Sequence, residues 1–284
     1  MTIFSDLLNE FTEATHNNRD KGTRFERLIA NYLMTNPQYS DRLADVWLWA
    51  EWPDRWGSDD GIDLVARERG TGDYWAIQCK FLDPANMLDK AGIDSFLAAS
   101  GKKFATTEGG FHFSTRLIVS TTDKWTSKAE KTLEAQTIPV CRLWFKDLAD
   151  SPIDWSQFSL SNIKDIQLKK KNALREHQQD AITAVVDGFK EHDRGKLIMA
   201  CGTGKTFTAL RLMEQVVPKN GRVLFLAPSI SLVSQSLREW TAQAITPIHA
   251  FAVCSDSKVG KDKEDLSLHD LAYPATTDLS LIHI

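Results

Sequence analysis

The chain has 284 residues, of which 42% are hydrophobic and 25% are charged, a balance typical of a soluble globular protein with room for two modest domains. Its four cysteines lie far apart without a C-x-x-C pair, which argues against a zinc knuckle or a disulfide scaffold. No apolar run is long enough to cross a bilayer and the start lacks a basic signal-peptide end, so we expect a cytoplasmic protein without membrane contacts. The net charge of −4 neither supports nor excludes DNA binding, which depends on local patches and bridging metal ions.

The first region alternates helices and strands. Apolar residues at helical spacing predict a short helix over residues 4–11 and a second helix that opens at Thr23. The signal changes to strands and turns over residues 46–80. The remaining elements alternate in type: a helix at 91–100, a strand at 115–120, a helix at 127–135 and a strand at 140–145.

A polar stretch over residues 151–172 ends in three lysines and precedes a new amphipathic helix, so we place a domain boundary near residue 165. The second region runs helix, strand, glycine turn, helix, strand and helix, which is the opening order of a parallel, doubly wound sheet. Its strands are expected at residues 196–200 and 222–227, with a helix at 206–215 between them. The fold class is therefore α/β in both regions.

A candidate catalytic patch lies in residues 61–80, which read GIDLVARERGTGDYWAIQCK and predict two strands joined by a glycine-rich turn. Folding the hairpin back sets Asp63 beside Gln78 and Lys80, which share one face of the second strand. Hydrolysis of a phosphodiester needs a hard divalent ion, an activated water and positive charge where negative charge develops. Asp63 can hold Mg²⁺, and Lys80 can supply the charge.

Gln78 offers a neutral carbonyl oxygen, a weaker magnesium ligand than a carboxylate. This pattern resembles the D…QxK variant of the PD-(D/E)xK family found in Mrr-like endonucleases. Members usually add an acid from an early helix, and the resemblance assigns that catalytic and metal-binding place to Glu26 in GTRFERLIANYL. Without the resemblance, Thr23-x-x-Glu26 is also a capping-box pattern, and Asp63 or Lys80 alone would be a turn-flanking acid or a solvated lysine.

Tryptophans are concentrated around this hairpin. The alternation of Trp47 and Trp49 favours a strand face packed in a core, whereas Trp52 or Trp56, if exposed, could stack on bases. Residues 115–122 resemble the strand that follows the active hairpin in Mrr-like domains, and their hydroxyls are candidates for contacts with DNA phosphates.

A nucleotide site is indicated by the run ACGTGKT, which follows one predicted strand and precedes a helix, as a P-loop does. Backbone N–H groups would cradle the phosphates of ATP, Lys205 would neutralise the β and γ phosphates, and the Thr206 hydroxyl would hold Mg²⁺. Met199 stands where this motif usually has glycine, a position that superfamily 2 helicases commonly relax. The residues expected to bind ATP are Gly202, Thr203, Gly204, Lys205 and Thr206.

Two flanking segments extend this helicase resemblance. The run LREHQ resembles the element whose glutamine reads adenine, which makes Gln178 the expected adenine contact; its alternative is a surface helix residue. The run APSISLVSQ resembles helicase motif Ia, where Pro228 and Ser229 would hold DNA phosphates at a strand end. No Walker B acid follows, so we expect this chain to bind ATP weakly without efficient turnover.

The order of these motifs over residues 22–278 resembles the amino-terminal part of single-chain type ISP restriction-modification enzymes. The resemblance implies an Mrr-like restriction-endonuclease domain (1–165) and a first RecA-like helicase domain with a parallel sheet, truncated before Walker B (166–278). The terminal LSLIHI, residues 279–284, matches a translated sequencing-library adapter and is expected to be a cloning or assembly scar. In the family a methyltransferase and a target-recognition region follow the motor.

The leading functional hypothesis is a Mg²⁺-dependent DNA endonuclease coupled to an ATP-dependent translocase on double-stranded DNA, restricting foreign DNA. One alternative is a nuclease-helicase without a methyltransferase, active in modification-dependent restriction or repair. Another is a catalytically silent DNA-binding module, because glutamine in place of an acid weakens metal affinity.

Overall fold

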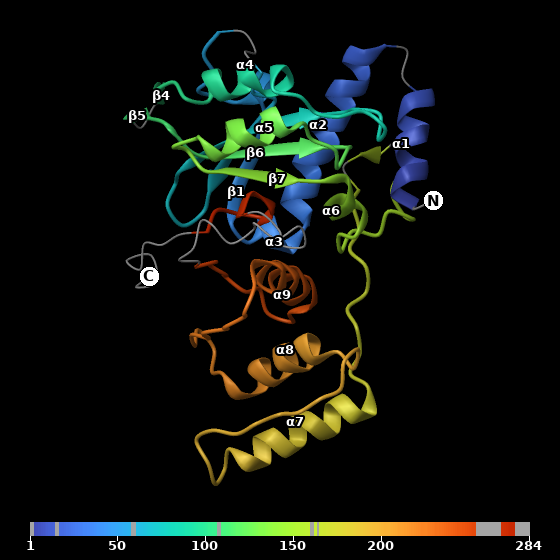
Figure 1. Cartoon of the computed structure of the whole chain (residues 1–284), viewed down its shortest axis with the longest axis vertical. Coiled ribbons are helices and arrows are strands. Elements are labelled where there is room, and N and C mark those ends of the chain that lie inside the picture. Colours follow the sequence, from blue (N-terminus) through green and yellow to red (C-terminus); the bar gives the residue numbers. More distant parts are fainter. Residues whose placement is uncertain are drawn as a thin grey trace. The chain divides into compact units, whose positions relative to one another are not determined.

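The computed structural model describes residues 3–14, 17–57, 61–106, 109–159, 162–163, 165–253 and 268–275. The chain divides into two compact units, of which one joins Met1–Lys169 to Phe251–Ile284 and the other is Lys170–Ala250 (Figure 1). The second predicted domain ran on to residue 278, whereas the described residues 251–253 and 268–275 group with the first unit. The predicted scar, residues 279–284, lies outside the described residues.

The first unit is built on a five-stranded mixed sheet in the order β1-β2-β3-β6-β7. Strands β1, β2 and β3 are antiparallel neighbours, while β3, β6 and β7 are parallel. The strands are β1 (Leu43–Leu48), β2 (Leu64–Glu68), β3 (Tyr74–Lys80), β6 (Phe113–Ser120) and β7 (Val140–Leu143), with β4 (Phe104–Thr106) and β5 (Gly109–Phe111) forming a separate hairpin. The α/β class and the predicted hairpin over 61–80 are confirmed.

Helices cover both faces of this sheet (Figure 1). On one face, α4 (Ala91–Ala99) and α5 (Ser127–Glu134) share an apolar cluster with Tyr74 and Ala76 of β3. Because side chains alternate along a strand, the fully buried Trp75 and Ile77 face the other side, where α2 packs against β1 and β3. The other helices of this unit are α1 (Ile3–Glu13), α2 (Asn18–Thr35), α3 (Pro37–Ser40), α6 (Phe145–Ala149) and the short η1 (Trp49–Glu51) and η3 (Leu268–Asp270).

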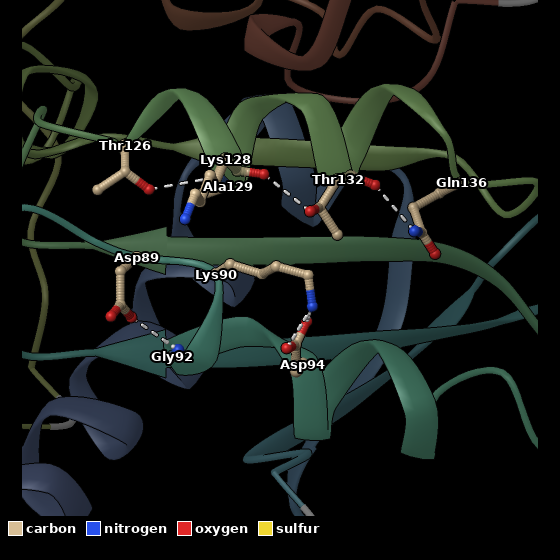
Figure 2. A network of polar contacts seen from close by, with 9 residues as sticks. All are labelled: Asp89, Lys90, Gly92, Asp94, Thr126, Lys128, Ala129, Thr132 and Gln136. Carbon is tan, nitrogen blue, oxygen red and sulfur yellow. Dashed lines mark hydrogen bonds and ion pairs between the residues drawn. The ribbon is translucent and has the colours of Figure 1, made fainter.

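Local side chains fix where the two crossover helices begin (Figure 2). Asp89 Oδ1 accepts from the N–H of Gly92 at 2.9 Å ahead of α4, and Thr126 Oγ1 accepts from the N–H of Ala129 at 3.3 Å ahead of α5. Such side-chain bonds satisfy backbone donors that a helix start leaves unpaired. Both helices therefore begin close to the residues that the sequence predicted.

Helix α2 begins earlier than predicted. Its N-cap is Asn17, whose side chain accepts from the N–H of Asp20 at 2.8 Å, so Thr23 already lies inside the helix. The predicted start at Thr23 is wrong, and so is the capping-box interpretation of Glu26. The core location predicted for the tryptophans is confirmed, since Trp49 and Trp52 are buried and Trp47 and Trp56 pack against the same cluster, but Trp49 lies in η1 and not on the predicted strand face. In the part of the chain described, no helix is long and apolar enough to span a bilayer.

The second unit contains three helices, α7 (Glu176–Gly188), α8 (Lys205–Val216) and α9 (Ile230–Gln243). Buried Phe207, Leu210 and Ala244 form its small core. The two predicted strands, 196–200 and 222–227, run without strand pairing, and Ile198 and Leu224 are 90% and 82% exposed. Parallel strands are stable when neighbours pair them and helices cover both faces, and two such segments alone do not provide this. The parallel sheet predicted for this region is therefore not formed among its described residues.

The segment from Leu268 to Tyr273 belongs to the first unit and packs against β7. Asp270 Oδ1 accepts from Arg142 Nε at 2.9 Å and from Trp144 Nε1 at 2.7 Å. Both partners of the ion pair are nearly buried, with side chains 6% and 8% exposed, and the guanidinium lies 4.3 Å from the Trp144 ring centroid. Burial with several hydrogen bonds makes this pair sensitive to the loss of one partner.

We expect Asp270→Ala to destabilise the chain by about 3 kcal/mol, because it leaves a buried guanidinium without its closest carboxylate. The matched control is Asp94→Ala, which removes an exposed i,i+4 partner of Lys90 and should change stability by less than about 0.5 kcal/mol (Figure 2). Urea denaturation followed by fluorescence measures both. Equal midpoints for the two variants would contradict the role of Asp270.

Candidate active sites

The end of the β2–β3 hairpin brings the predicted nuclease residues together. Asp63 directly precedes β2, while Gln78 and Lys80 lie at the end of β3. Asp63 donates its N–H to the carbonyl of Ile77 at 2.9 Å, and Asp63 Oδ2 accepts from the N–H of Cys79 at 2.6 Å. The Asp63 carboxylate is thus held against the strand that carries the other two groups.

Gln78 is almost completely buried, at 1% exposure, and its amide is oriented by a single contact. Nε2 donates to the carbonyl of Gly61 at 3.1 Å, while Oε1 is buried with no hydrogen-bond partner in the structure. Only glycine suits position 61, where φ is +99° and a Cβ atom would lie 2.8 Å from Ser95 Oγ. A buried carbonyl oxygen without a partner costs about 1–3 kcal/mol, which marks Oε1 as an acceptor with unused capacity.

Glu26 lies on the turn of α2 that packs at the end of β3. Its neighbour Phe25 makes an edge-on ring contact with Phe81 at 5.4 Å, and Lys21 Nζ lies 5.3 Å from the centroid of the same ring. Phe81 directly follows Lys80, so these contacts bring the start of α2 to the strand end that carries the predicted catalytic residues Gln78 and Lys80.

The pKa of the Cys79 thiol depends on the charges around this strand end. Burial raises its pKa well above the usual value, the carboxylates of Asp63 and Glu26 raise it further, and Lys80 acts in the opposite direction. The three charged residues therefore lie within electrostatic range of one sulfur atom. Among the described residues, no group of three or more His, Cys, Asp or Glu side chains is placed to hold a metal.

The hydroxyls at the end of β6 do not face solvent. Thr121 and Thr122 are buried, and their Oγ1 atoms donate to the carbonyls of Leu82 and Asn86 at 2.6 and 2.7 Å. The hypothesis that these hydroxyls contact DNA phosphates is therefore wrong, because they are used within the fold.

The predicted P-loop has the local geometry of an anion site. Gly202 and Gly204 adopt φ of +76° and +80°, and Gly204 caps the twelve-residue helix α8, which begins at Lys205. Thr203 Oγ1 and Lys205 Nζ both donate to the carbonyl of Ala200, at 2.7 and 3.2 Å. The exposed N–H groups at such a helix start attract phosphate.

Gln178 is buried against this loop rather than lying on a helix surface. Its Nε2 donates to the carbonyl of Thr203 at 3.0 Å, and its Oε1 accepts from the N–H of Arg175. A Cβ atom on Gly204 would lie 2.6 Å from Nε2, so a larger residue there would displace the Gln178 amide. The surface alternative is wrong, and the amide is already engaged with the loop.

The predicted DNA contact Ser229 makes a hydrogen bond within the chain. It caps α9 by accepting from the N–H of Leu232 at 3.3 Å. Pro228 directly precedes that cap, so the motif Ia residues lie at a helix start.

Two successive parts of the chain match known protein families. Residues 34–165 match the family described as restriction endonuclease, and residues 171–272 match the family described as Type III restriction enzyme, res subunit. The chain therefore carries a restriction-endonuclease domain followed by a helicase-like domain.

One solved structure, the "ATP-dependent Type ISP restriction-modification enzyme LlaBIII bound to DNA", is 37% identical with a TM-score of 0.79. The similarity covers 98% of this chain but only 17% of that enzyme's chain. The predicted resemblance to type ISP restriction-modification enzymes is confirmed. A search of curated proteins found no match to the chain.

Alkylation of Cys79 tests the arrangement of charges at the strand end. Asp63→Asn and Glu26→Gln should each accelerate its reaction with iodoacetamide at pH 9 by roughly threefold, because removing a negative charge lowers the thiol pKa. Peptide mass spectrometry follows each site, with exposed Cys201 as the internal reference.

The control for this experiment is Asp73→Asn, at the other end of the same hairpin, which should leave the rate unchanged. An unchanged rate in Glu26→Gln would place Glu26 away from the nuclease residues.

Proposed function

We propose that this chain is the nuclease and ATP-binding portion of a restriction enzyme that cuts double-stranded DNA with Mg²⁺ and is driven along DNA by ATP. The observation that supports this most directly is the buried, unpartnered Oε1 of Gln78 at the end of β3, which also carries Lys80 and against which Asp63 is held. Hard cations prefer oxygen ligands, and amide oxygens are among them.

In the nuclease reaction, Asp63, Glu26 and Gln78 Oε1 would hold Mg²⁺, which when bound polarises the scissile phosphate. The Lys80 ammonium, two residues beyond Gln78 on the same strand face, would stabilise the negative charge that develops on the phosphate oxygens. The Cys79 N–H fixes the Asp63 carboxylate in place before DNA binds, so little rearrangement is needed.

Plasmid cleavage by the full chain tests this role. We expect Mg²⁺-dependent nicking that falls roughly 100-fold in Asp63→Asn and in Lys80→Ala, because each removes a charge from the reacting site. The matched controls are Asp73→Asn and Lys131→Ala, exposed residues outside the site, which should cut like the wild type. Electrophoresis of supercoiled, nicked and linear forms gives the rates.

Two other outcomes would contradict the proposal. Equal cutting by all variants would point to a contaminating nuclease. DNA binding without any cutting, together with no Mg²⁺ binding, would favour the silent binding module.

For the nucleotide, the chain offers a helix start with two left-handed glycines and a lysine. Lys205 Nζ now donates to the Ala200 carbonyl, and ATP would offer the ammonium a charged partner instead. Thr206 would hold the accompanying Mg²⁺, and Gly202, Thr203 and Gly204 would present backbone N–H groups. Gln178 would contact adenine in addition to its bond with the loop.

Titration with a fluorescent ATP analogue tests these assignments. Lys205→Ala should weaken binding roughly tenfold or more through loss of the phosphate contact, whereas Lys219→Ala, an exposed lysine after the same helix, should not. Gln178→Ala distinguishes an adenine contact from mere support of the loop. Loss of an adenine contact should reduce the preference for ATP over GTP. Equal weakening for both nucleotides would instead assign Gln178 to loop support alone and overturn its adenine role.

The remaining activities belong to the longer enzyme. By similarity to the type ISP enzyme we propose that translocation, a methyltransferase and a target-recognition region complete the protein, and that it restricts foreign DNA in the cytoplasm. This chain spans 17% of that relative's length.

A further inference from the structure

We propose that Thr121 is a positioning residue that holds Lys80 in place for DNA cleavage; the inference rests on the proposed nuclease function. Thr121 follows β6, the parallel neighbour of β3, and is 0% exposed. Its N–H donates to the carbonyl of Lys80 at 3.1 Å. Its Oγ1 donates to the carbonyl of Leu82 at 2.6 Å and accepts from the N–H of Leu82 at 2.8 Å.

These three bonds act where the sheet no longer supports β3. The ladder with β2 ends at the Leu64–Ile77 pair, so residues from Gln78 to Lys80 have a strand neighbour only on the β6 side. The ladder with β6 ends at the pair of Lys80 with Ser120. Strand ends with few partners open most easily, and Lys80 is the last residue of β3.

The Thr121 hydroxyl compensates for the missing ladder. It donates to the C=O of Leu82 and accepts from the N–H of Leu82, which are the two bonds that a neighbouring strand would provide. Together with the backbone bond to Lys80, it fixes the chain on both sides of Phe81. The backbone on both sides of Phe81 is therefore held by one residue, through its N–H at Lys80 and through its buried hydroxyl at Leu82.

The rate of catalysis is more sensitive to the exact position of a reacting side chain than the stability of the fold is. A displacement of about 1 Å at a reacting group can lower a rate roughly 100-fold. Loss of one hydroxyl need not unfold a chain, so a change at position 121 should appear first in the rate of cutting.

Thr122 provides a matched control within the same strand end. It is equally buried, but its Oγ1 donates to the carbonyl of Asn86 at 2.7 Å and accepts from the N–H of Lys124 at 3.2 Å. Its hydroxyl therefore holds a segment further from Lys80. Replacing either threonine by valine keeps the shape and removes one buried hydroxyl.

The test is Mg²⁺-dependent cleavage of supercoiled plasmid by the full chain, with kcat and KM for DNA measured separately. Thr121→Val should lower kcat roughly tenfold or more while KM stays within about twofold, and Thr121→Ser, which keeps the hydroxyl, should restore most of it. Thr122→Val should retain wild-type kcat even where its melting temperature falls by the same amount. Thr121→Cys, with its weak hydrogen-bonding thiol, is measured alongside in case the valine variant does not fold, with the same expectation.

The outcomes separate this inference from the function on which it rests. If Asp63→Asn is inactive while Thr121→Val and Thr121→Cys cut like the wild type, the positioning role is wrong and the nuclease function stands. If Thr122→Val loses as much kcat as Thr121→Val, the effect is one of general stability and the positioning role is again wrong. Cutting that does not depend on Asp63 would overturn the proposed function itself.

Discussion

The arrangement of the first unit depends on the two different neighbours of β3. Its antiparallel pairing with β2 brings the residue that precedes β2 beside the end of β3, and its parallel pairing with β6 brings the end of β6 to that same place. Asp63, Lys80 and Thr121 thus converge although they are far apart in sequence. The parallel pair also requires a crossover, which α4 provides by covering the face that holds Gln78.

The hairpin could be predicted because its signals are local: alternating apolar residues and a glycine-rich turn. The start of α2 could not, because T-x-x-E is a capping pattern only where the chain is not already helical, and Asn17 caps the helix earlier. The buried hydroxyls of Thr121 and Thr122 were assigned to DNA because their partners lie in a connection distant in sequence. The unpartnered Oε1 of Gln78 likewise follows from tertiary burial.

The second unit shows the same division between local and long-range determinants. The P-loop geometry forms from two glycines and a helix start, which need only neighbouring residues. The two apolar segments that flank it stay unpaired, since strand formation requires partners across a sheet. Gln178 depends on both kinds of determinant. It lies on α7, a helix that could be predicted from local sequence, but its contact with the loop joins residues 25 apart in the chain.

The glutamine at position 78 has an electrostatic rationale. A carboxylate there would be almost fully buried near the charges of Asp63 and Glu26, which already raise the pKa of the neighbouring thiol. Burial and like charges would favour its protonated form and weaken the Gly61 contact that an amide N–H makes. An amide keeps an oxygen available at every pH without adding repulsion. The amide brings one negative charge fewer toward a cation than a carboxylate would. If the proposed Mg²⁺ binds here, DNA phosphate has to contribute more of its binding energy than in a site with three acids.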